Sequence, residues 1–326
     1  MRHVSLRVVD ALVLLWLVTT LTFALVHLAP GDPATLLIAP TATAAEAAEL
    51  RARLGLDAPL GVQYGRWIGA VLRGDLGTSL VTSRPVTHVI GDALPISLFL
   101  GGVSLLLSFV IGIGLGGWQA LRARTLGDRT ASVLATVLFA APGFWLALAL
   151  VALFTSGAVW LGLPAWLRLP AFGMQSPDAG ADPSLADRWR HAMLPLLVLT
   201  VPGAAGVARY ARETLRDARG SLAVQAAFAR GLSRARVEWR YILRTALTPL
   251  VVLFGLTLPG IVAGSVFVEQ VFAWPGLGRA LLSAIAGRDY PVVLGLTLIY
   301  GATVIGANLL ADVALWWLDP RRRSPS

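Results

Sequence analysis

Cysteine and lysine are absent from this chain of 326 residues, and histidine is scarce. Without cysteine there is no disulfide, no thiolate nucleophile and no thiolate metal ligand. Because all 27 basic residues are arginine, the chain also lacks the kind of phosphate-binding loop that ends in a lysine. We therefore do not expect it to hydrolyse ATP by that route. The four histidines, at positions 3, 27, 88 and 191, do not have the i, i+4 spacing of a helical metal site.

Charged residues are also few. They make up 14% of the chain, against about 25% in soluble domains, and they cluster so that long apolar runs remain between them. Hydrophobic residues reach 56% and the mean hydropathy is +0.72. This composition is typical of a protein that spans a membrane several times.

Six apolar stretches are long enough to cross a hydrocarbon core of about 30 Å, which takes about 20 helical residues. The sequence therefore predicts an all-α integral membrane protein with six transmembrane helices. The first stretch follows Arg2 and Arg7 as in a signal peptide, but its apolar run is long for one, and we expect a retained span. The spans are expected near residues 11–29, 96–120, 131–154, 193–210, 248–271 and 291–317.

The arginines are unevenly distributed about these spans. If the N-terminus is cytoplasmic, 17 of the 27 arginines lie in or beside inner segments, but only 7 of the 18 acidic residues do. Basic residues resist translocation, so both termini are expected in the cytoplasm. The positive net charge then reflects topology and anionic lipid headgroups rather than nucleic acid.

The first outer loop has helical signals of its own. Thr43 and Glu46 form a capping box, and Gly55 marks the end of that helix. A second helix places Tyr64 and Trp67 on one face, as expected for a lid on the outer membrane surface or for a packing element. The second outer loop, near residues 155–192, is expected to be mostly irregular. The chain thus divides into residues 1–29 with the first span, a helical periplasmic loop at 30–94, and a five-helix core at 95–326.

The spans carry no acidic residue at mid-membrane depth, where an ion-coupled carrier usually needs one. This argues against a secondary transporter without excluding it. Helix breakers are numerous instead, as Pro-Gly pairs begin at residues 142, 202 and 259. Proline removes a backbone hydrogen bond and permits a kink, so these spans either pack in the ordinary way or bend around a transient cavity.

One basic segment interrupts this apolar chain. The stretch "QAAFARGLSRARVEWRYILRTALTP", from Gln225 to Pro249, holds five arginines and lies between the fourth and fifth spans. We expect a short helix that ends at Gly231 and a second helix capped by Ser233. Spacing alone is also compatible with a juxtamembrane helix anchored on lipid headgroups.

Motifs in this segment and along the whole chain resemble one family. "QAAFARGL" followed by "ILRTALTPL" resembles the EAA loop of permease subunits in bacterial ABC importers, with Gln225 in place of the glutamate. "HLAPGDPA", "RLGLDAPLGVQYGRW", "GDLGTSL", "VFVEQVFAWPGLGRALLSAIAGRDYPVV" and "LDPRRR" are similar, in the same order, to the dipeptide, oligopeptide and nickel branch. The long first outer loop resembles that of the first, B-type, permease of the pair.

The resemblance implies a permease core whose EAA loop, at about 211–247, is a cytoplasmic coupling helix that docks on an ATPase. Small side chains would allow close approach, and arginines would add steering. ATP and Mg²⁺ would be bound by two partner nucleotide-binding subunits and no cofactor by this chain, which would not itself be an enzyme. A homologous second permease would complete a heterodimer, and a substrate-binding protein would deliver the cargo. The implied coupling residues are Gln225, Ala226, Ala227, Arg230, Gly231 and Leu232.

The expected function is therefore half of a translocation pathway for peptides in the bacterial inner membrane. Nickel or a metal chelate is an alternative cargo, and an ion-coupled carrier or a membrane scaffold is an alternative class. The sequence does not assign the residues that line the pathway.

Overall fold

The computed structural model describes residues 2–28, 43–53, 55–180, 184–263 and 265–318. These residues form helices and connecting loops, and six helical segments are long and apolar enough to cross a membrane, as predicted. They are Val9–Leu28, Val86–Leu121, Gly143–Trp160, Leu185–Gly220, Arg234–Thr257 and Tyr290–Ala311. The chain forms two compact units, residues 1–97 with 275–305 and residues 98–274 with 306–326.

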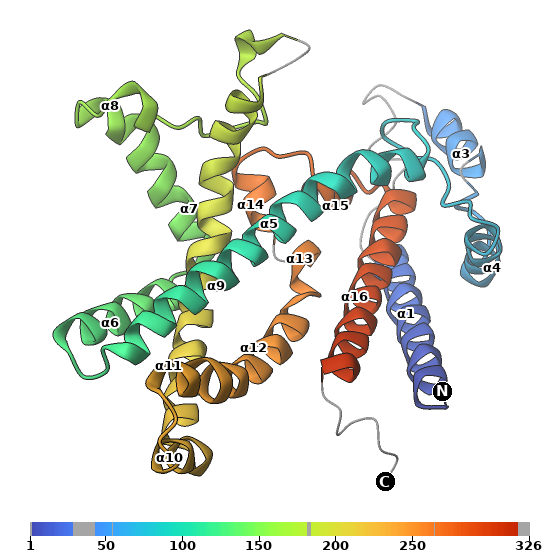
Figure 1. Cartoon of the computed structure of the whole chain (residues 1–326). Coiled ribbons are helices and arrows are strands. Elements are labelled where there is room, and N and C mark those ends of the chain that lie inside the picture. The colour runs from blue at the N-terminus through green and yellow to red at the C-terminus, as the bar shows by residue number, and fades with distance from the viewer. Residues whose placement is uncertain (1, 29–42, 54, 181–183, 264, 319–326) are drawn as a thin grey trace. The chain divides into compact units, whose positions relative to one another are not determined.

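Figure 1 labels the helices, and their colours run from blue to red in chain order. They are α1 (Arg2–Leu28), α3 (Ala44–Arg53), α4 (Leu60–Val71), α5 (Val86–Leu121), α6 (Leu126–Ala140), α7 (Gly143–Ala152), α8 (Ala158–Trp160), α9 (Leu185–Gly220), α10 (Leu222–Ala229), α11 (Arg234–Val237), α12 (Arg244–Thr257), α13 (Gly260–Ala263), α14 (Val266–Val271), α15 (Leu277–Ala286) and α16 (Tyr290–Leu318).

Two predicted spans have other boundaries in the structure. The third, predicted at 131–154, is interrupted at Pro142, and the membrane-length segment runs from Gly143 to Trp160 through a π-helical turn at Leu153–Gly157. The fifth, predicted at 248–271, is instead Arg234–Thr257, because the basic segment continues into α12 and the chain breaks before Gly260. Both breaks fall at Pro-Gly pairs, whereas α9 remains helical through Pro202.

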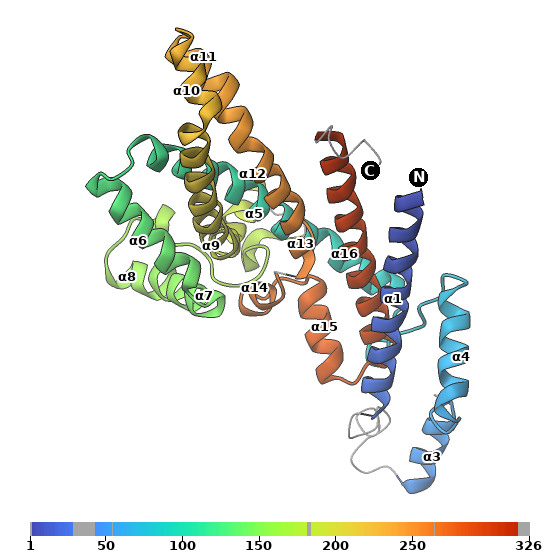
Figure 2. The same cartoon turned by 90° about the horizontal axis from the view of Figure 1, so that it is seen from below.

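In the first unit, α1 lies beside the first part of α16 (Figures 1 and 2). Gly301 of α16 permits this approach, since a Cβ atom there would lie 2.5 Å from Leu15 Cδ1. On another side of α1, Tyr64 of α4 shares a 2.6 Å hydrogen bond with Thr20, and its ring packs edge-on to Phe23. The outer-loop helix α4 is thus fixed to the first span by an aromatic contact and a hydroxyl pair.

The capping box predicted for α3 is confirmed. The backbone N–H of Thr43 donates to Glu46 Oε2 at 2.7 Å, and the Glu46 N–H donates to Thr43 Oγ1 at 3.3 Å. Gly55 has a φ of 69°, in the left-handed region where an L side chain is strained, and α3 ends before it. In the described part of the second outer loop, short helical turns at Leu153–Gly157, Ala158–Trp160, Ala165–Leu167 and Pro177–Ala179 alternate with irregular stretches, and α9 already begins at Leu185, within the segment predicted to be irregular.

In the second unit, α9 packs against α6, α7 and α12. The part of α5 in this unit also approaches it closely: a Cβ atom at Gly116 would lie 2.4 Å from the carbonyl oxygen of Ala208. The turn before α6 is held by charge, because Asp128 is 1% exposed and accepts two hydrogen bonds from Arg212 of α9 and one from Arg124 N–H. Backbone contact and a buried ion pair together fix α5, α6 and α9.

Candidate functional site

The predicted basic segment forms what we call the α10–α11 loop, residues 221–243. It contains α10, α11 and a π-helical turn at Glu238–Leu243 that leads into α12. Gly231 has a φ of 72°, and the N–H of Leu232 donates to the Ala227 carbonyl at 3.3 Å, which closes the end of α10. Ser233 stands at the N-cap of α11 as predicted, but its side chain makes no capping hydrogen bond.

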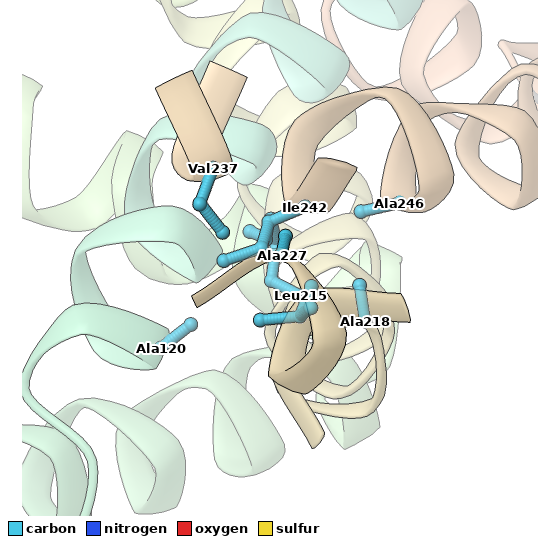
Figure 3. Close-up of a cluster of buried hydrophobic side chains, with 8 residues drawn as sticks. Ala120, Leu215, Ala218, Ala227, Val237, Ile242 and Ala246 are labelled. Atoms are coloured by element: carbon cyan, nitrogen blue, oxygen red, sulfur yellow. The ribbon is translucent and has the colours of Figure 1, made fainter. Parts of the chain in front are cut away.

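The inner face of this loop is packed into the chain's own core. Ala227 is 0% exposed and lies in a cluster that also draws on the ends of α5 and α9 (Figure 3). The cluster consists of Ala120, Leu215, Ala218, Val224, Ala227, Val237, Ile242 and Ala246, with Leu232 and Tyr241 partly buried against it. The loop is therefore fixed to the helices rather than suspended from them.

An ion pair strengthens this attachment. Arg219, near the end of α9, donates to Glu238 Oε2 at 3.0 Å and to the carbonyl oxygen of Ala120 at the end of α5, also at 3.0 Å. One guanidinium thus connects α5, α9 and the turn that follows α11. Displacement of the loop would be transmitted to both long helices through this contact.

The outer face of the loop is apolar and basic. Leu222 is 80% exposed, Trp239 74% and Phe228 47%. The five arginines of the segment, Arg230, Arg234, Arg236, Arg240 and Arg244, are exposed as well. Exposed large apolar side chains bordered by cations are typical of a surface that binds a partner protein or lipid.

The six residues assigned to coupling do not share one environment. Gln225, Ala226, Arg230 and Gly231 are exposed, while Leu232 is half-buried. Ala227 faces inward, so its small side chain packs against the core of this chain.

Two of the exposed coupling residues are held by neighbours in the loop. The side chain of Gln225 donates to the Gly220 carbonyl at 3.2 Å. That of Arg230 donates to the Ala226 carbonyl at 3.2 Å.

The ion pairs that hold the loop and α6 were missed from the sequence. Arg212 and Asp128 are 84 residues apart, and Arg219 and Glu238 are 19 apart. The sequence held one clue to them: a charged residue near the end of a long apolar helix needs a partner of opposite charge once that residue is buried. Within the described part of the chain, no group of three or more histidine, aspartate or glutamate side chains is arranged to hold a metal ion.

Comparison with known proteins places this architecture in a family. The profile of the family described as "Binding-protein-dependent transport system inner membrane component" matches residues 109–324, and the profile of its N-terminal region matches residues 1–101. The chain belongs to this family. The resemblance inferred from the sequence motifs is thereby confirmed, and the protein is a permease component of an ABC transport system.

Several relatives match over nearly their whole length. The oligopeptide transport system permease protein OppB of Mycobacterium bovis is 36% identical, with 99% of each chain covered. AppB, the corresponding oligopeptide permease of Bacillus subtilis, is 34% identical over 93% of each chain. The glutathione transport system permease protein GsiC of Salmonella paratyphi A is 35% identical over 99% of each chain.

The fold has also been seen in a solved structure. A crystal structure of an amino acid ABC transporter with histidines superimposes with a TM-score of 0.51 and covers 73% of this chain and 95% of that chain. The two sequences are 14% identical, so this likeness concerns the fold alone.

Proposed function

We propose that this chain forms half of the pathway of an ATP-driven importer that takes up peptides delivered by a substrate-binding protein. Its family is that of binding-protein-dependent transport, and the relatives named above are named for oligopeptide or glutathione. Glutathione is itself a tripeptide. These names favour peptides over nickel or a metal chelate as the cargo.

The observation that carries the mechanism is the two-sided α10–α11 loop. Its inner face is anchored to α5 and α9 by the buried cluster and by Arg219, whereas its outer face presents Leu222, Phe228 and the arginines. We infer that this outer face docks in a cleft of a cytoplasmic ATPase. Exposed apolar side chains bordered by arginines are complementary to an apolar cleft with an acidic rim. When ATP closes the ATPase, the docked loop would move α5 and α9 with it.

Other subunits supply what this chain does not. Two nucleotide-binding subunits bind ATP and Mg²⁺ and carry the hydrolysis, so this chain is not an enzyme and holds no cofactor. A homologous second permease forms a heterodimer with it, and both termini lie on the cytoplasmic side of the inner membrane. Cargo passes through a transient cavity between helices and needs no high-affinity site here.

Reconstitution tests this proposal. The chain is purified alone and together with a homologous second permease, the ATPases and a binding protein, and each preparation is placed in proteoliposomes. We expect no ATP hydrolysis by the chain alone, and ATP-dependent peptide uptake only by the full set with binding protein present. ATP turnover by a preparation shown to be free of ATPase subunits, or uptake without ATP, would contradict it.

A further inference from the structure

A cavity of about 650 Å³ opens between α6, α9 and α12 in the second unit. Small-molecule sites in proteins measure about 300–1,000 Å³, so the space is large enough for a small ligand. Two glycines of α9, Gly203 and Gly206, line it and contribute no side chain. The Phe139 ring of α6 packs directly over Gly206, where a Cβ atom would lie 2.9 Å from the ring.

The walls of the cavity are largely apolar, but hydroxyl groups form part of them. Ser132 and Thr136 of α6 and Thr257 of α12 bring hydroxyl groups to it. The Thr136 hydroxyl donates to the Ser132 carbonyl at 2.9 Å, and that of Thr257 donates to the Phe254 carbonyl at 2.9 Å. These hydroxyl groups are satisfied within the chain, and each hydroxyl oxygen can still accept a further hydrogen bond from water or a ligand.

Three charged side chains line the cavity, and two of them have ionic partners. Arg212 binds Asp128 and also donates to Glu213 Oε1 at 2.6 Å. Glu213 lies 3.7 Å from Arg216 as well. These four groups are engaged with one another, so they are poorly placed to hold a passing ligand.

Arg209 is the third charged side chain that lines the cavity. It is exposed, and in the described part of the chain it lies against an aromatic ring: its guanidinium carbon is over Phe139, 5.5 Å from the ring centroid. A guanidinium that rests on an aromatic ring by its face keeps its N–H groups free in the plane of the group. The neighbouring Tyr210, 41% exposed, also lines the cavity and carries a phenolic donor.

We propose that this cavity is a transient anion site on the transport path, where Arg209 pairs with a carboxylate of the cargo and Tyr210 adds a hydrogen bond. The inference rests on the proposed function and deepens it by assigning a recognised group, the free carboxylate of a peptide. The guanidinium group of an arginine can donate two parallel hydrogen bonds to one carboxylate. Since Arg209 is solvent-exposed, the pair is weak enough for the cargo to leave again.

The first test compares two cargoes that differ at the C-terminal group, which is a charged carboxylate in one and a neutral amide in the other. The complete transporter in proteoliposomes is given tri-alanine or its C-terminal amide, with wild type, Arg209→Gln, Arg209→Lys and the control Arg129→Gln. Arg129 is an exposed arginine of α6 outside the cavity. Loss of this weak, exposed pair predicts that Arg209→Gln lowers uptake of the acid about three- to fivefold and that of the amide less than about twofold.

Arg209→Lys should recover part of the acid uptake, and Arg129→Gln should match wild type. The binding protein is the same throughout, so its own preference between acid and amide cancels in the comparison. An equal loss for acid and amide would overturn the proposal, because Arg209 would then support the fold or hold a lipid phosphate instead.

A second test does not depend on cargo. Thr136→Cys gives the assembled transporter a single thiol in this chain, in the cavity that Arg209 also lines. An anionic methanethiosulfonate should label it faster than a cationic one, and Arg209→Gln should remove the preference. Equal rates with Arg209 present would overturn the anion site. Charge-selective labelling of a transporter that does not take up tri-alanine would support the site and overturn peptide as the cargo.

Discussion

The guanidinium of Arg212 donates two hydrogen bonds to the carboxylate of Asp128, at 2.7 and 2.8 Å. The pair joins α9 to the first turn of α6, and Asp128 is 1% exposed there. A buried carboxylate is costly unless it is paired, so this contact makes the position of α6 depend on Arg212. The helices that surround the proposed path are thereby tied together by a specific charge pair.

Removal of one partner should be strongly destabilising. Asp128→Ala leaves Arg212 without its main partner in a half-buried site, and we expect a loss of about 3 kcal/mol in the free energy of unfolding. The exposed pair of Glu49 and Arg53 is a matched control, since Glu49→Ala should cost less than about 1 kcal/mol. Heat-unfolding midpoints in detergent measure both. Similar losses for the two variants would show that the buried pair contributes no more to stability than the exposed pair.

The contribution of the Asp128–Arg212 pair to stability should not change with pH over the usual working range. The hydrogen bonds from Arg212 are the largest cause that lowers the pKa of Asp128 to about 2, against an ordinary value of 3.8. A depressed carboxyl pKa contributes stability that is present above the unfolded value and is lost as pH falls through the folded one. The stability difference between wild type and Asp128→Asn should thus stay constant from about pH 5 to 8 and shrink below about pH 4. A change of the difference near pH 6 would contradict this assignment.

A second buried carboxylate organises the loop before α5 in the first unit. Asp289, before α16, accepts hydrogen bonds from the Ser79 hydroxyl at 2.5 Å and from the Leu80 N–H at 3.0 Å. Asp289→Ala leaves these donors unsatisfied, at about 1–3 kcal/mol each. We expect the amides of residues 79–82 to exchange hydrogen at least about tenfold faster, as measured by mass spectrometry.

The exposed pair of Asp92 and Arg84 provides the comparison, because Asp92→Ala removes an ion pair whose side chains are more than half exposed. Its effect on the same amides should be small. Unchanged exchange in Asp289→Ala would mean that the loop is held by other contacts.

Local signals in the sequence predicted much of this fold. Long apolar runs gave the six spans, the pairing of Thr43 with Glu46 gave the start of α3, and Gly231 gave the end of α10. Each of these features is encoded within a few neighbouring residues or within one helix. The fifth span was misplaced because the polar residues of Arg234–Leu243 are helical and extend that helix beyond its apolar part, and the third because the helix breaks at Pro142 and continues through a π-helical turn.

Long-range relationships could not be read in this way. Ser79 and Asp289 are 210 residues apart, and no periodicity connects them. The orientation of α10 could not be predicted either. Its sequence, "LAVQAAFA", is apolar or small on almost every side, so the pattern does not indicate which face is buried. Only the packed structure shows that Ala227 points to the core and Ala226 to solvent.

Single cysteines can establish the orientation in the membrane, since the chain has none of its own. Ala44 and Ser233 are both exposed and lie in loops that the arginine distribution assigns to opposite sides. We expect Ala44→Cys in intact cells to react with a membrane-impermeant maleimide and Ser233→Cys to react only after permeabilisation. The reverse pattern would overturn the topology with both termini inside.

Gly231 offers the sharpest test of the docking surface. A Cβ atom built there meets nothing within 4 Å in this chain, so a side chain would project outward from the loop. Its φ of 72° also strains most L residues by about 1–2 kcal/mol, but asparagine tolerates that region. Gly231→Ala therefore reports on strain with little added bulk, Gly231→Asn adds a side chain about as large as leucine's with little strain, and Gly231→Leu adds both bulk and strain.

If the loop docks on an ATPase, Gly231→Leu should keep membrane insertion and lose most ATP-dependent uptake, because its side chain blocks close approach of the partner. Gly231→Asn should also lose most uptake, because its side chain is about as large, and Gly231→Ala should stay closer to wild type. Ala227→Trp does not serve the same purpose, since overpacking of the buried cluster costs about 1–3 kcal/mol and disturbs the loop itself. A headgroup anchor predicts the opposite outcome, as leucine favours an interface and activity would be unchanged or raised. Uptake and binding-protein-stimulated ATPase activity in proteoliposomes separate the two, and wild-type values for Gly231→Leu would remove this loop from the coupling mechanism.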